Sequence, residues 1–366
     1  MPKIVFFHLF NDFSGSPKVL SQVISGVQQN GRVIDIITSS GKGALTRLKD
    51  IPGVNFHTFS YKFYANKVIT ALNFIYAQIY MFLYSFRYIF DKDVIFYINT
   101  LLPAGALISG KLQGKRIICH YHENAYVKGR FYKMLSWLMQ KISTTIICVS
   151  DYQRSYLSRI HDVHVVNNAL DVDFNKEYLH DPVKSFNRKT ILMLGSLKKY
   201  KGIYEFIELA KMLPDYHFDL VASDTQENVD AFITSYDKEF PENVDLYSRQ
   251  ADVRPFYRNS SVLLNLSDKR WVIETFGLTA IEAMAFGVPV IVPTVGGIAE
   301  LVDDGYNGYK IDVANLQSIK EKLTVMLTDF DLYRRLSDAA YRSSSKYSYK
   351  NMMENINEII AQTQKK

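Results

Sequence analysis

The chain alternates short, continuously apolar runs with helical runs, and this alternation starts a second time near its middle. Strands that are apolar along their whole length are typical of parallel sheets covered by helices on both faces. Strands that alternate with helices in this way predict a doubly wound α/β fold. Because the chain has 366 residues, more than double a typical single domain, we expect two such domains in succession.

The expected elements fall into two groups that are separated by a polar segment. In the first group, we expect strands at Lys3–Phe10, Arg32–Thr38, Val54–Phe59, Asp93–Ile98, Arg116–His122, Thr144–Ser150 and Val163–Val166, with helices at Pro17–Gln29, Val127–Lys141 and Tyr152–Ile160. In the second, we expect strands at Thr190–Gly195, His217–Ala222, Val244–Tyr247, Ser261–Leu266 and Val288–Val292, with helices at Ile203–Leu213, Val253–Arg258 and Thr279–Phe286. Residues 171–189 are polar, contain Pro182 and are interpreted as a linker, so the predicted Rossmann-like domains are 1–175 and 185–345. Ligands of such sheets bind at the carboxyl ends of the strands, and two domains facing each other would place the site in a cleft.

Composition narrows the classes of partner. The formal net charge of +6 suits anionic ligands such as phosphates or acidic lipid headgroups, but it is too diffuse for nucleic acid. Cys119 and Cys148 lie in apolar runs and are expected to be buried and unpaired, which indicates a reducing, cytoplasmic compartment. The N-terminal residues lack the layout of a signal peptide.

One apolar segment, Val68 to Phe90, is long enough to span a bilayer, for which about 20 residues are needed. Asn73, Gln78 and Arg87 interrupt it, and spanning segments rarely carry a charge, so we expect a buried or surface-lying helix. The aromatic and basic residues of 61–92 predict contact with anionic lipid at the inner face of the cytoplasmic membrane. A buried helix with an aromatic core face is the alternative, and helical spacing does not separate the two.

The first predicted strand runs into a turn that contains Gly15. Glycine lets a ligand approach the backbone, Ser16 is expected to cap the following helix, and Pro17 is expected to begin it. The free N–H groups of such a helix start suit a phosphate. An ordinary turn from strand to helix explains the same three residues equally well.

Two histidines follow another predicted strand, at its carboxyl end. His120 and His122 are two residues apart, so their side chains point the same way if the strand continues. Glu123 beside them suggests a metal site, but the sequence contains no third ligand at a recognised metal spacing. We therefore expect a histidine that hydrogen-bonds substrate, with a structural histidine as the alternative.

In the second half, lysines crowd a turn between two glycines. Lys198, Lys199 and Lys201 lie between Gly195, which ends a predicted strand, and Gly202, which precedes a predicted helix. Cationic side chains at such a position make a phosphate site. Lysines are also common in solvated loops, which is the alternative.

The most specific stretch runs from Glu274 to Gly308 and contains two carboxylates separated by seven residues, Glu274 and Glu282. Thr279 and Glu282 also match a capping box, a structural reason for the second carboxylate. The capping box does not explain Glu274 or the second glycine turn at residues 296–297. Two helix starts that each carry glycine would converge on one anionic ligand.

This stretch resembles the retaining glycosyltransferases of the GT-B fold, of the family 4 (group 1) kind. The positions that match the family pattern are Glu274, Phe276, Gly277, Glu282, Ala283, Met284, Ala285, Gly287, Pro289, Val290 and Ile291, then Gly296, Gly297, Glu300, Asp304, Gly305, Asn307 and Gly308. Upstream, Asn168 matches an asparagine that the family follows with glycine, where this chain has Ala169. The resemblance covers nearly the whole chain.

The resemblance implies a role for each matched position of the donor site. Glu282 would bind the ribose of the donor nucleotide, Glu274 would contact the transferred sugar, and Lys201 would neutralise the departing diphosphate. Backbone N–H groups around Gly277 and Leu278 would hold the diphosphate and sugar. The remaining residues implied in donor binding are Gly15, Ser16, Gly195, Ser196, Phe276 and Thr279.

The resemblance also implies the division of labour between domains. The first domain would bind the acceptor, a glycan or lipid-linked molecule, with His122 near the reacting sugar, and the second would bind a nucleoside diphosphate sugar. UDP is the expected nucleotide, with GDP as the alternative. Residues 346–366 would form a helix that returns to the first domain. Transfer would retain the anomeric configuration by front-face attack as the diphosphate departs, because no carboxylate is placed as an evident covalent nucleophile. The resemblance also implies a role in surface polysaccharide or glycolipid synthesis.

One departure concerns the phosphate site, because Ser196 stands where the family has arginine. Lys198 and Lys199 are the candidates for replacing that arginine. Two Asp-x-Asp patterns, Asp91–Asp93 and Asp171–Asp173, match a short metal motif of other glycosyltransferases, but surface acids explain them better. We therefore expect no obligatory metal or other cofactor.

Two rival functions remain open at this point. The first is another enzyme on the same fold, a nucleotide-sugar epimerase or a phosphorylase. The second is a partner subunit without catalytic activity, which the joint presence of His122, Lys201, Glu274 and Glu282 disfavours.

Overall fold

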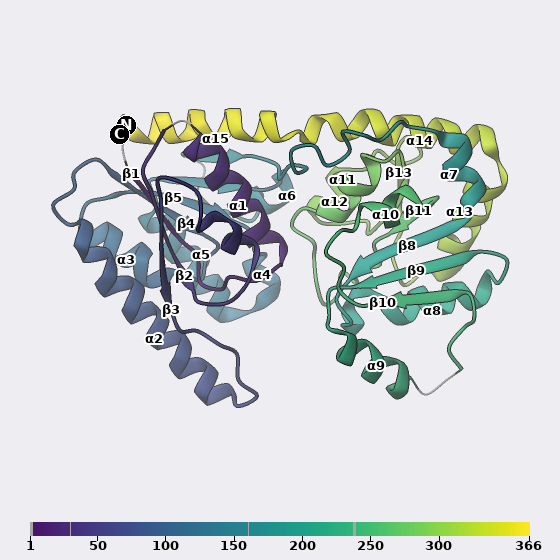
Figure 1. The fold of residues 1–366 in the computed structure, drawn as a ribbon, viewed down its shortest axis with the longest axis horizontal. Helices are drawn as coiled ribbons and strands as arrows, with labels where there is room; N and C mark the ends of the chain where they lie inside the picture. The colour runs from purple at the N-terminus through teal and green to yellow at the C-terminus, as the bar shows by residue number, and fades with distance from the viewer. Residues whose placement is uncertain (1–2, 30, 160, 237–238) are drawn as a thin grey trace. The chain divides into compact units, whose positions relative to one another are not determined.

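The computed structural model describes residues 3–29, 31–159, 161–236 and 239–366. The chain divides into two compact units, the first comprising residues 1–169 with 349–366 and the second residues 170–348. Each unit contains a parallel sheet with helices packed on it (Figure 1). The predicted fold of two Rossmann-like domains is thereby confirmed. The segment 171–189, interpreted as a linker, belongs to the second unit.

The first unit has a seven-stranded sheet in the order β3-β2-β1-β4-β5-β6-β7, in which all paired strands are parallel. Its strands are β1 Lys3–Phe7, β2 Ile34–Ser39, β3 Val54–Phe59, β4 Val94–Asn99, β5 Arg116–Tyr121, β6 Thr145–Cys148 and β7 Val163–Val165. The strand order reverses between β1 and β4. At such a switch point the loops after the two strands diverge and leave a crevice for a ligand.

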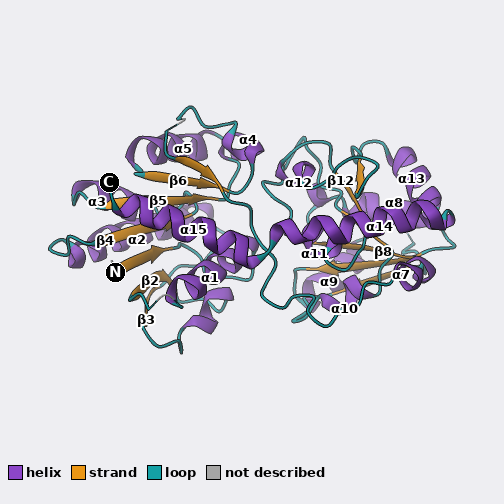
Figure 2. Cartoon of the chain, turned by 90° about the horizontal axis from the view of Figure 1, so that it is seen from above, coloured by secondary structure: helices purple, strands orange, loops and turns teal. Residues whose placement is uncertain are grey.

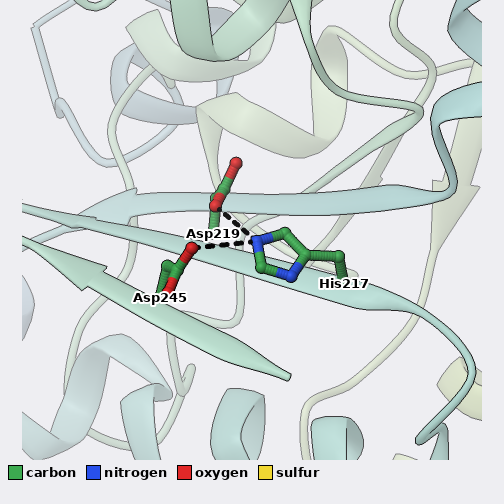
Figure 3. Close-up of side chains that lie close together, drawn as sticks. All are labelled: His217, Asp219 and Asp245. Carbon is green, nitrogen blue, oxygen red and sulfur yellow. Dashed lines mark hydrogen bonds and ion pairs between the residues drawn. The ribbon is translucent and has the colours of Figure 1, made fainter. Parts of the chain in front are cut away.

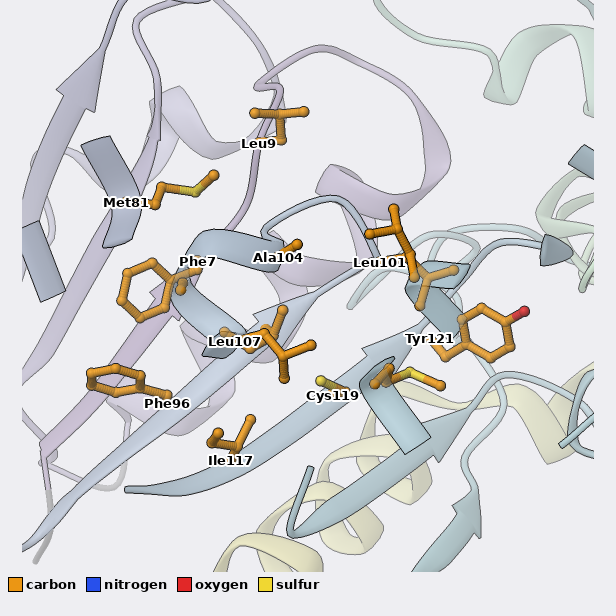
Figure 4. Packing of buried hydrophobic residues seen from close by; sticks show 14 of the residues in the cluster. Phe7, Leu9, Met81, Phe96, Leu101, Ala104, Leu107, Ile117, Cys119 and Tyr121 are labelled. Carbon is orange, nitrogen blue, oxygen red and sulfur yellow. The ribbon is translucent and has the colours of Figure 1, made fainter. Parts of the chain in front are cut away.

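Helices cover both faces of this sheet. They are α1 Gly15–Gln28, α2 Lys67–Ser85, α3 Ala104–Leu112, α4 Ala125–Lys128, α5 Arg130–Ile142, α6 Asp151–Arg154 and α15 Tyr349–Gln364, with short 3-10 helices η1 Ala44–Leu48 and η2 Phe86–Tyr88. On one face, Met81 of α2 and Leu107 of α3 pack with Phe7, Phe96 and Ile117 of the strands (Figure 4). Burying each of these large side chains contributes about 1.5–3 kcal/mol, which fixes the sheet that carries the site.

The C-terminal helix α15 belongs to the first unit, and it crosses the sheet near β5 (Figure 2). The hydroxyl of Tyr349 donates to the carbonyl of Gln22, and the hydroxyls of Thr145 and Thr363 are 2.9 Å apart. A Cβ at Gly26 of α1 would lie 2.5 Å from the Met353 side chain. The close contact of α1 with α15 therefore depends on that glycine.

The second unit has a six-stranded parallel sheet in the order β10-β9-β8-β11-β12-β13. Its strands are β8 Thr190–Gly195, β9 His217–Ala222, β10 Val244–Tyr247, β11 Val262–Leu264, β12 Val290–Val292 and β13 Gly308–Lys310. Its helices are α7 Pro182–Arg188, α8 Ile203–Met212, α9 Gln226–Ser235, α10 Arg254–Arg258, α11 Leu278–Met284, α12 Gly297–Glu300, α13 Leu316–Thr328 and α14 Phe330–Ser344, with η3 Lys199–Lys201 and η4 Ser345–Tyr347. The switch point here lies between β8 and β11.

The start of α1 differs from the prediction. The helix begins at Gly15 after Ser14, so Ser16 is not its cap and Pro17 is its third residue. The N–H and hydroxyl of Ser14 both bond the carboxylate of Asp12, and this local turn begins the helix two residues earlier than expected.

Three other expected segments also differ from the structure. The helix expected at 127–141 is interrupted at Gly129, whose φ of 103° is a conformation that α-helices exclude. The predicted linker contains α7, because Pro182 suits a first helical turn and Asp181 caps it through the N–H groups of residues 183 and 184. The helix expected at 152–160 spans Asp151–Arg154, and Ile160 lies outside the described residues.

Candidate active site

In the second unit, the loops after β8 and β11 are held together at the switch point. A Cβ on Gly202, whose φ is +81°, would lie 2.3 Å from the carbonyl oxygen of Leu266. The N–H of Asp268 donates to the carbonyl of Tyr200 over 2.9 Å. The lysine turn predicted from sequence therefore lies directly against the segment that leads to Glu274.

The two glycine helix starts also meet. Gly277 before α11 and Gly296 before α12 have φ values of +114° and +107°, which favour glycine. A Cβ on Gly277 would lie 2.5 Å from the side chain of Ile298, and one on Gly296 would lie 2.6 Å from the carbonyl oxygen of Glu274. The convergence expected from the sequence is therefore present in the backbone, and only glycine allows it.

Lys201 and Glu274 form an ion pair at this junction. Ser267 donates a second hydrogen bond to the same carboxylate over 2.9 Å. Burial alone would raise the pKa of Glu274, but the ammonium of Lys201 and these hydrogen bonds outweigh burial and hold the pKa below its usual value. Glu274 is therefore an ionised hydrogen-bond acceptor beside a cation, at the carboxyl end of the sheet.

Glu282 lies within α11 and is buried. The capping box expected from sequence is absent, since the residue at the N-cap is Gly277 and Thr279 is the second helical residue. Glu282 instead accepts a hydrogen bond of 2.7 Å from the hydroxyl of Tyr257. Burial and this carboxylate raise the pKa of Tyr257 well above its usual value, so the phenol remains a donor.

Most of the remaining predicted donor residues belong to the second unit, whereas Gly15 and Ser16 lie at the start of α1 in the first unit. Gly195 is the last residue of β8, and the carbonyl of Ser196 accepts from the N–H of Lys198 over 2.7 Å. Leu278 is the first residue of α11, whereas Phe276 is buried and packs edge-on against the ring of Tyr347. Phe276 thus supports the loop from beneath. Lys198 and Lys199 are both exposed, and Lys198 lies over the ring of Tyr200.

In the first unit, Asn99 connects predicted site residues, although it is not itself among the residues predicted from the sequence. Its side-chain oxygen lies 3.0 Å from Nε2 of His122, and its amide nitrogen lies 3.3 Å from the carbonyl oxygen of Ser16. The same nitrogen lies 3.1 Å from Nδ1 of His8. Asn99 is the last residue of β4, so a polar residue ending an apolar strand was the available signal.

The three histidines of this network have lowered pKa values. Burial lowers the pKa of His8 to about 4 and that of His120 to about 3. Burial, together with the charges that His120 and His8 would carry, holds the pKa of His122 well below its usual value. The rings of His120 and His122 lie 4.2 Å apart, although β5 ends at Tyr121 and the strand does not continue to His122 as the prediction required. All three are therefore neutral imidazoles near pH 7.

The carboxylate of Glu123 forms hydrogen bonds with the backbone of its own domain. It accepts the backbone N–H of Leu101 through both oxygens, at 3.2 and 3.1 Å. That bond holds the loop after β4, where Thr100 has a φ of +73°, a strained value for a β-branched residue. Strain of this kind is common where a site is held in a fixed geometry.

One group of side chains in the described part of the chain has metal-ligand spacing: His217, Asp219 and Asp245 (Figure 3). His217 lies 3.1 Å from the carboxylate of Asp219 and 3.2 Å from that of Asp245. His217 begins β9, so this group lies away from the strand ends that carry Lys201. Neither Asp-x-Asp pattern is part of the group.

Comparison with known proteins agrees with this geometry. The model of Glycosyltransferase Family 4 matches residues 13–174, and that of Glycosyl transferases group 1 matches residues 175–343. An uncharacterized glycosyltransferase of Methanocaldococcus jannaschii is 29% identical over 266 residues, 70% of each chain. A capsular polysaccharide biosynthesis glycosyltransferase of Staphylococcus aureus is 27% identical over 273 residues, 67% of this chain and 70% of the relative.

Among solved structures, HepE of Anabaena in complex with UDP and glucose superimposes with a TM-score of 0.79. The match covers 99% of this chain and 100% of HepE at 16% identity, which shows a shared fold. The two family models follow one another along the chain and divide it close to the boundary between its compact units. The chain therefore belongs to the group 1 glycosyltransferases of the GT-B fold.

Proposed function

We propose that this glycosyltransferase moves a hexose-type sugar from a UDP-sugar to a hydroxyl of a glycan or lipid-linked acceptor, with retention at the anomeric carbon. The observation that carries the proposal is the Lys201–Glu274 ion pair at the switch point between β8 and β11. The UDP and glucose bound by HepE support the choice of donor. The name of the Staphylococcus aureus relative supports a role in surface polysaccharide synthesis.

The two residues of the ion pair suit the two parts of a diphosphate sugar, the diphosphate that departs and the sugar that is transferred. The ammonium of Lys201 has three N–H groups, and its charge would stabilise the negative charge that grows on the diphosphate as the C1–O bond breaks. Glu274, kept ionised by Lys201 and Ser267, would accept hydrogen bonds from sugar hydroxyls. Glu282, held by Tyr257, would accept those of the ribose.

Retention would follow from attack on the face that the diphosphate leaves. The acceptor oxygen bonds to C1, the C1–O bond to the β-phosphate breaks, and the hydroxyl proton passes to the departing phosphate oxygen. His122, whose low pKa makes its neutral ring a weak base, would hydrogen-bond the acceptor hydroxyl without taking up that proton. Glu274 is engaged with Lys201 and Ser267, an arrangement that suits orientation of the sugar better than nucleophilic attack.

No obligatory metal is proposed, because Lys201 offers the positive charge that a divalent cation supplies in other phosphoryl-group sites. We also place the enzyme in the cytoplasm, since Cys119 and Cys148 are both buried and unpaired. Activity is expected to survive EDTA. Complete loss of activity with EDTA, restored by manganese or magnesium, would contradict the metal-independent mechanism.

The proposed function can be tested by a donor screen followed by product analysis. Thermal unfolding in the presence of UDP- and GDP-sugars identifies the donor, because a ligand that binds the folded state raises the unfolding temperature. NMR of the product made from that donor then gives the anomeric configuration. An inverted linkage would contradict retention. A new nucleotide sugar formed from donor alone would indicate an epimerase, and a requirement for inorganic phosphate would indicate a phosphorylase.

A further inference from the structure

The outer face of α2 is apolar, which reverses the usual pattern of a surface helix. The helix buries Ala77, Met81 and Ser85 against the first unit. Large apolar side chains that repeat at helical spacing lie on its solvent side, and each is about half exposed or more: Val68, Leu72, Ile75, Tyr76, Ile79 and Leu83. A helix on the surface of a soluble domain normally carries polar residues there. A contiguous exposed apolar face of this kind marks an interaction surface.

The helix α5 extends this surface. Phe131, Met134 and Trp137 are exposed on it, with fractions of 47%, 54% and 59%. The rings of Phe131 and Phe74 lie 5.7 Å apart, which joins α5 to α2. We call the exposed apolar residues of these two helices the α2–α5 face.

Within the two stretches that form this face, the charges are all of one sign. Residues 61–90 and 124–150 contain no aspartate or glutamate. The exposed basic side chains in these stretches are Lys62, Lys67, Arg87, Lys128, Arg130, Lys133 and Lys141. Apolar residues flanked by lysine and arginine, without acidic residues, match a bilayer surface with anionic headgroups.

A groove of about 480 Å³ lies between α2 and α5. Its walls are almost wholly apolar and include Phe63, Phe74 and Phe131, with Lys67 beside them. Leu9 and Leu102 also line it, and these residues follow β1 and β4 on either side of the switch point. The face therefore adjoins the strand ends that carry the first unit's candidate site.

The helix α2 is tied to the domain by its inner face. The hydroxyls of Ser85 and Ser109 are 2.5 Å apart, and the side chain of Gln78 accepts the N–H of Gly105. Residues 67–88 are long and apolar enough to cross a membrane by length and composition. Crossing would break these contacts with α3, whereas lying in the membrane surface leaves them intact.

We infer that the α2–α5 face docks this enzyme on an anionic lipid membrane, with α2 and α5 lying in the headgroup region. Docking places the apolar groove where the hydrocarbon part of a lipid-linked acceptor can enter it beside the strand ends. That consequence for the acceptor rests on the proposed function, whereas membrane binding does not require sugar transfer. The two are therefore measured separately.

Native tryptophans give the first test, because the chain contains only Trp137 on α5 and Trp271 in the second unit. Trp271→Phe leaves Trp137 as the reporter, and Trp137→Phe leaves Trp271, which is 71% exposed, as the matched control. With vesicles of phosphatidylcholine and phosphatidylglycerol in equal parts, Trp137 emission is expected to shift to shorter wavelength and Trp271 emission to stay unchanged. No shift of Trp137 at low salt overturns the inference.

Sedimentation with the same vesicles gives the second test. Leu72→Ser/Ile79→Ser/Leu83→Ser is expected to lower binding at least tenfold, and so is Lys67→Gln/Arg130→Gln/Lys133→Gln. The control Leu179→Ser/Val183→Ser/Val325→Ser, which changes exposed apolar residues of the second unit, is expected to bind like the wild type. Wild-type binding that is equal on pure phosphatidylcholine would overturn the role of charge.

Folding and function are followed independently of vesicle binding. Thermal unfolding and UDP-sugar binding of each variant are expected to match the wild type, because the substitutions lie on exposed residues outside the donor site. If the wild type does not bind vesicles but is a dimer that the triple serine variant makes monomeric, the face is a protein interface and the inference is wrong. Unchanged vesicle binding with no sugar transfer would instead count against the proposed function alone.

Discussion

The two units place polar side chains at the same edge of similar parallel sheets, but these side chains are neutral in the first unit and charged in the second. In the first unit, Asn99 connects the neutral imidazoles of His8 and His122, and burial lowers the pKa of both. In the second, Lys201 keeps Glu274 ionised despite its burial. A neutral network suits a hydroxyl acceptor, and a matched ion pair suits a diphosphate whose charge grows during reaction. The contrast supports acceptor binding in the first unit and donor binding in the second.

The largest effect is expected from the charged site. Lys201→Ala removes the cation beside the leaving group and should lower kcat about 10²–10³-fold, more than it weakens donor binding. Steady-state kinetics with donor titration separate the two quantities. Lys211→Ala, an exposed lysine of the same unit, is the control and should leave kcat unchanged. An unchanged kcat for Lys201→Ala would remove the ion pair from the mechanism.

A smaller effect is expected from the nucleotide side of the same site. Glu282→Ala should weaken binding of UDP by about 1.5–3 kcal/mol, the range for hydrogen bonds to a charged group. Tyr257→Phe removes the donor to Glu282 but keeps the carboxylate, so it should cost less affinity. Calorimetry on the folded variants measures both. Equal losses in the two variants would show that Glu282 supports the fold and does not bind ribose.

The contrast between units also shows what the sequence could predict. The lysine turn, the paired carboxylates and the glycine helix starts are close in sequence to recognisable strand ends, so both their identity and their convergence followed from spacing. The charge state of each group could not be predicted from that spacing. The ionised state of Glu274 depends on Lys201, which is separated from it by 73 positions and is brought to it by the pairing of β8 with β11 and by the contacts between the loops that follow them.

The errors have a common cause as well. Asn99 was missed because its partners Ser16, in α1, and His122, after β5, come from different elements, and no local pattern links them. The capping box at Thr279 was wrong because the tertiary packing of Gly277 against Ile298 begins the helix earlier. The exposure of α2 could not be read from its composition, since apolar residues surround the helix and only packing against α3 shows which side is buried.

The neutral network gives the third prediction. Asn99→Ala should raise KM for the acceptor about tenfold, equivalent to roughly 1.4 kcal/mol, because His122 and Ser16 at the start of α1 lose their common partner. Donor affinity should stay the same, since no donor group proposed in the second unit is changed. Asn55→Ala, which removes a different asparagine of the same sheet, is the control. A loss of donor binding equal to the loss of acceptor binding would argue against the division between units.

The smallest expected effect is on stability and concerns His8. Its pKa is about 4 in the folded protein and near 6.5 in an unfolded chain, so between these values the unfolded state binds more protons. Stability contributed by the neutral ring is therefore present above pH 6.5 and is lost as the pH falls toward 4.

Between pH 7 and 5.5 the free energy of unfolding of the wild type should fall about 1 kcal/mol more than that of His8→Asn. Urea unfolding at the two pH values measures this difference, and His161→Asn, which removes an exposed histidine of the same unit, is the matched control. If His8→Asn shows the same pH dependence as the wild type, His8 is not held neutral by burial, and the first unit's site is less distinct from the charged site than the structure indicates.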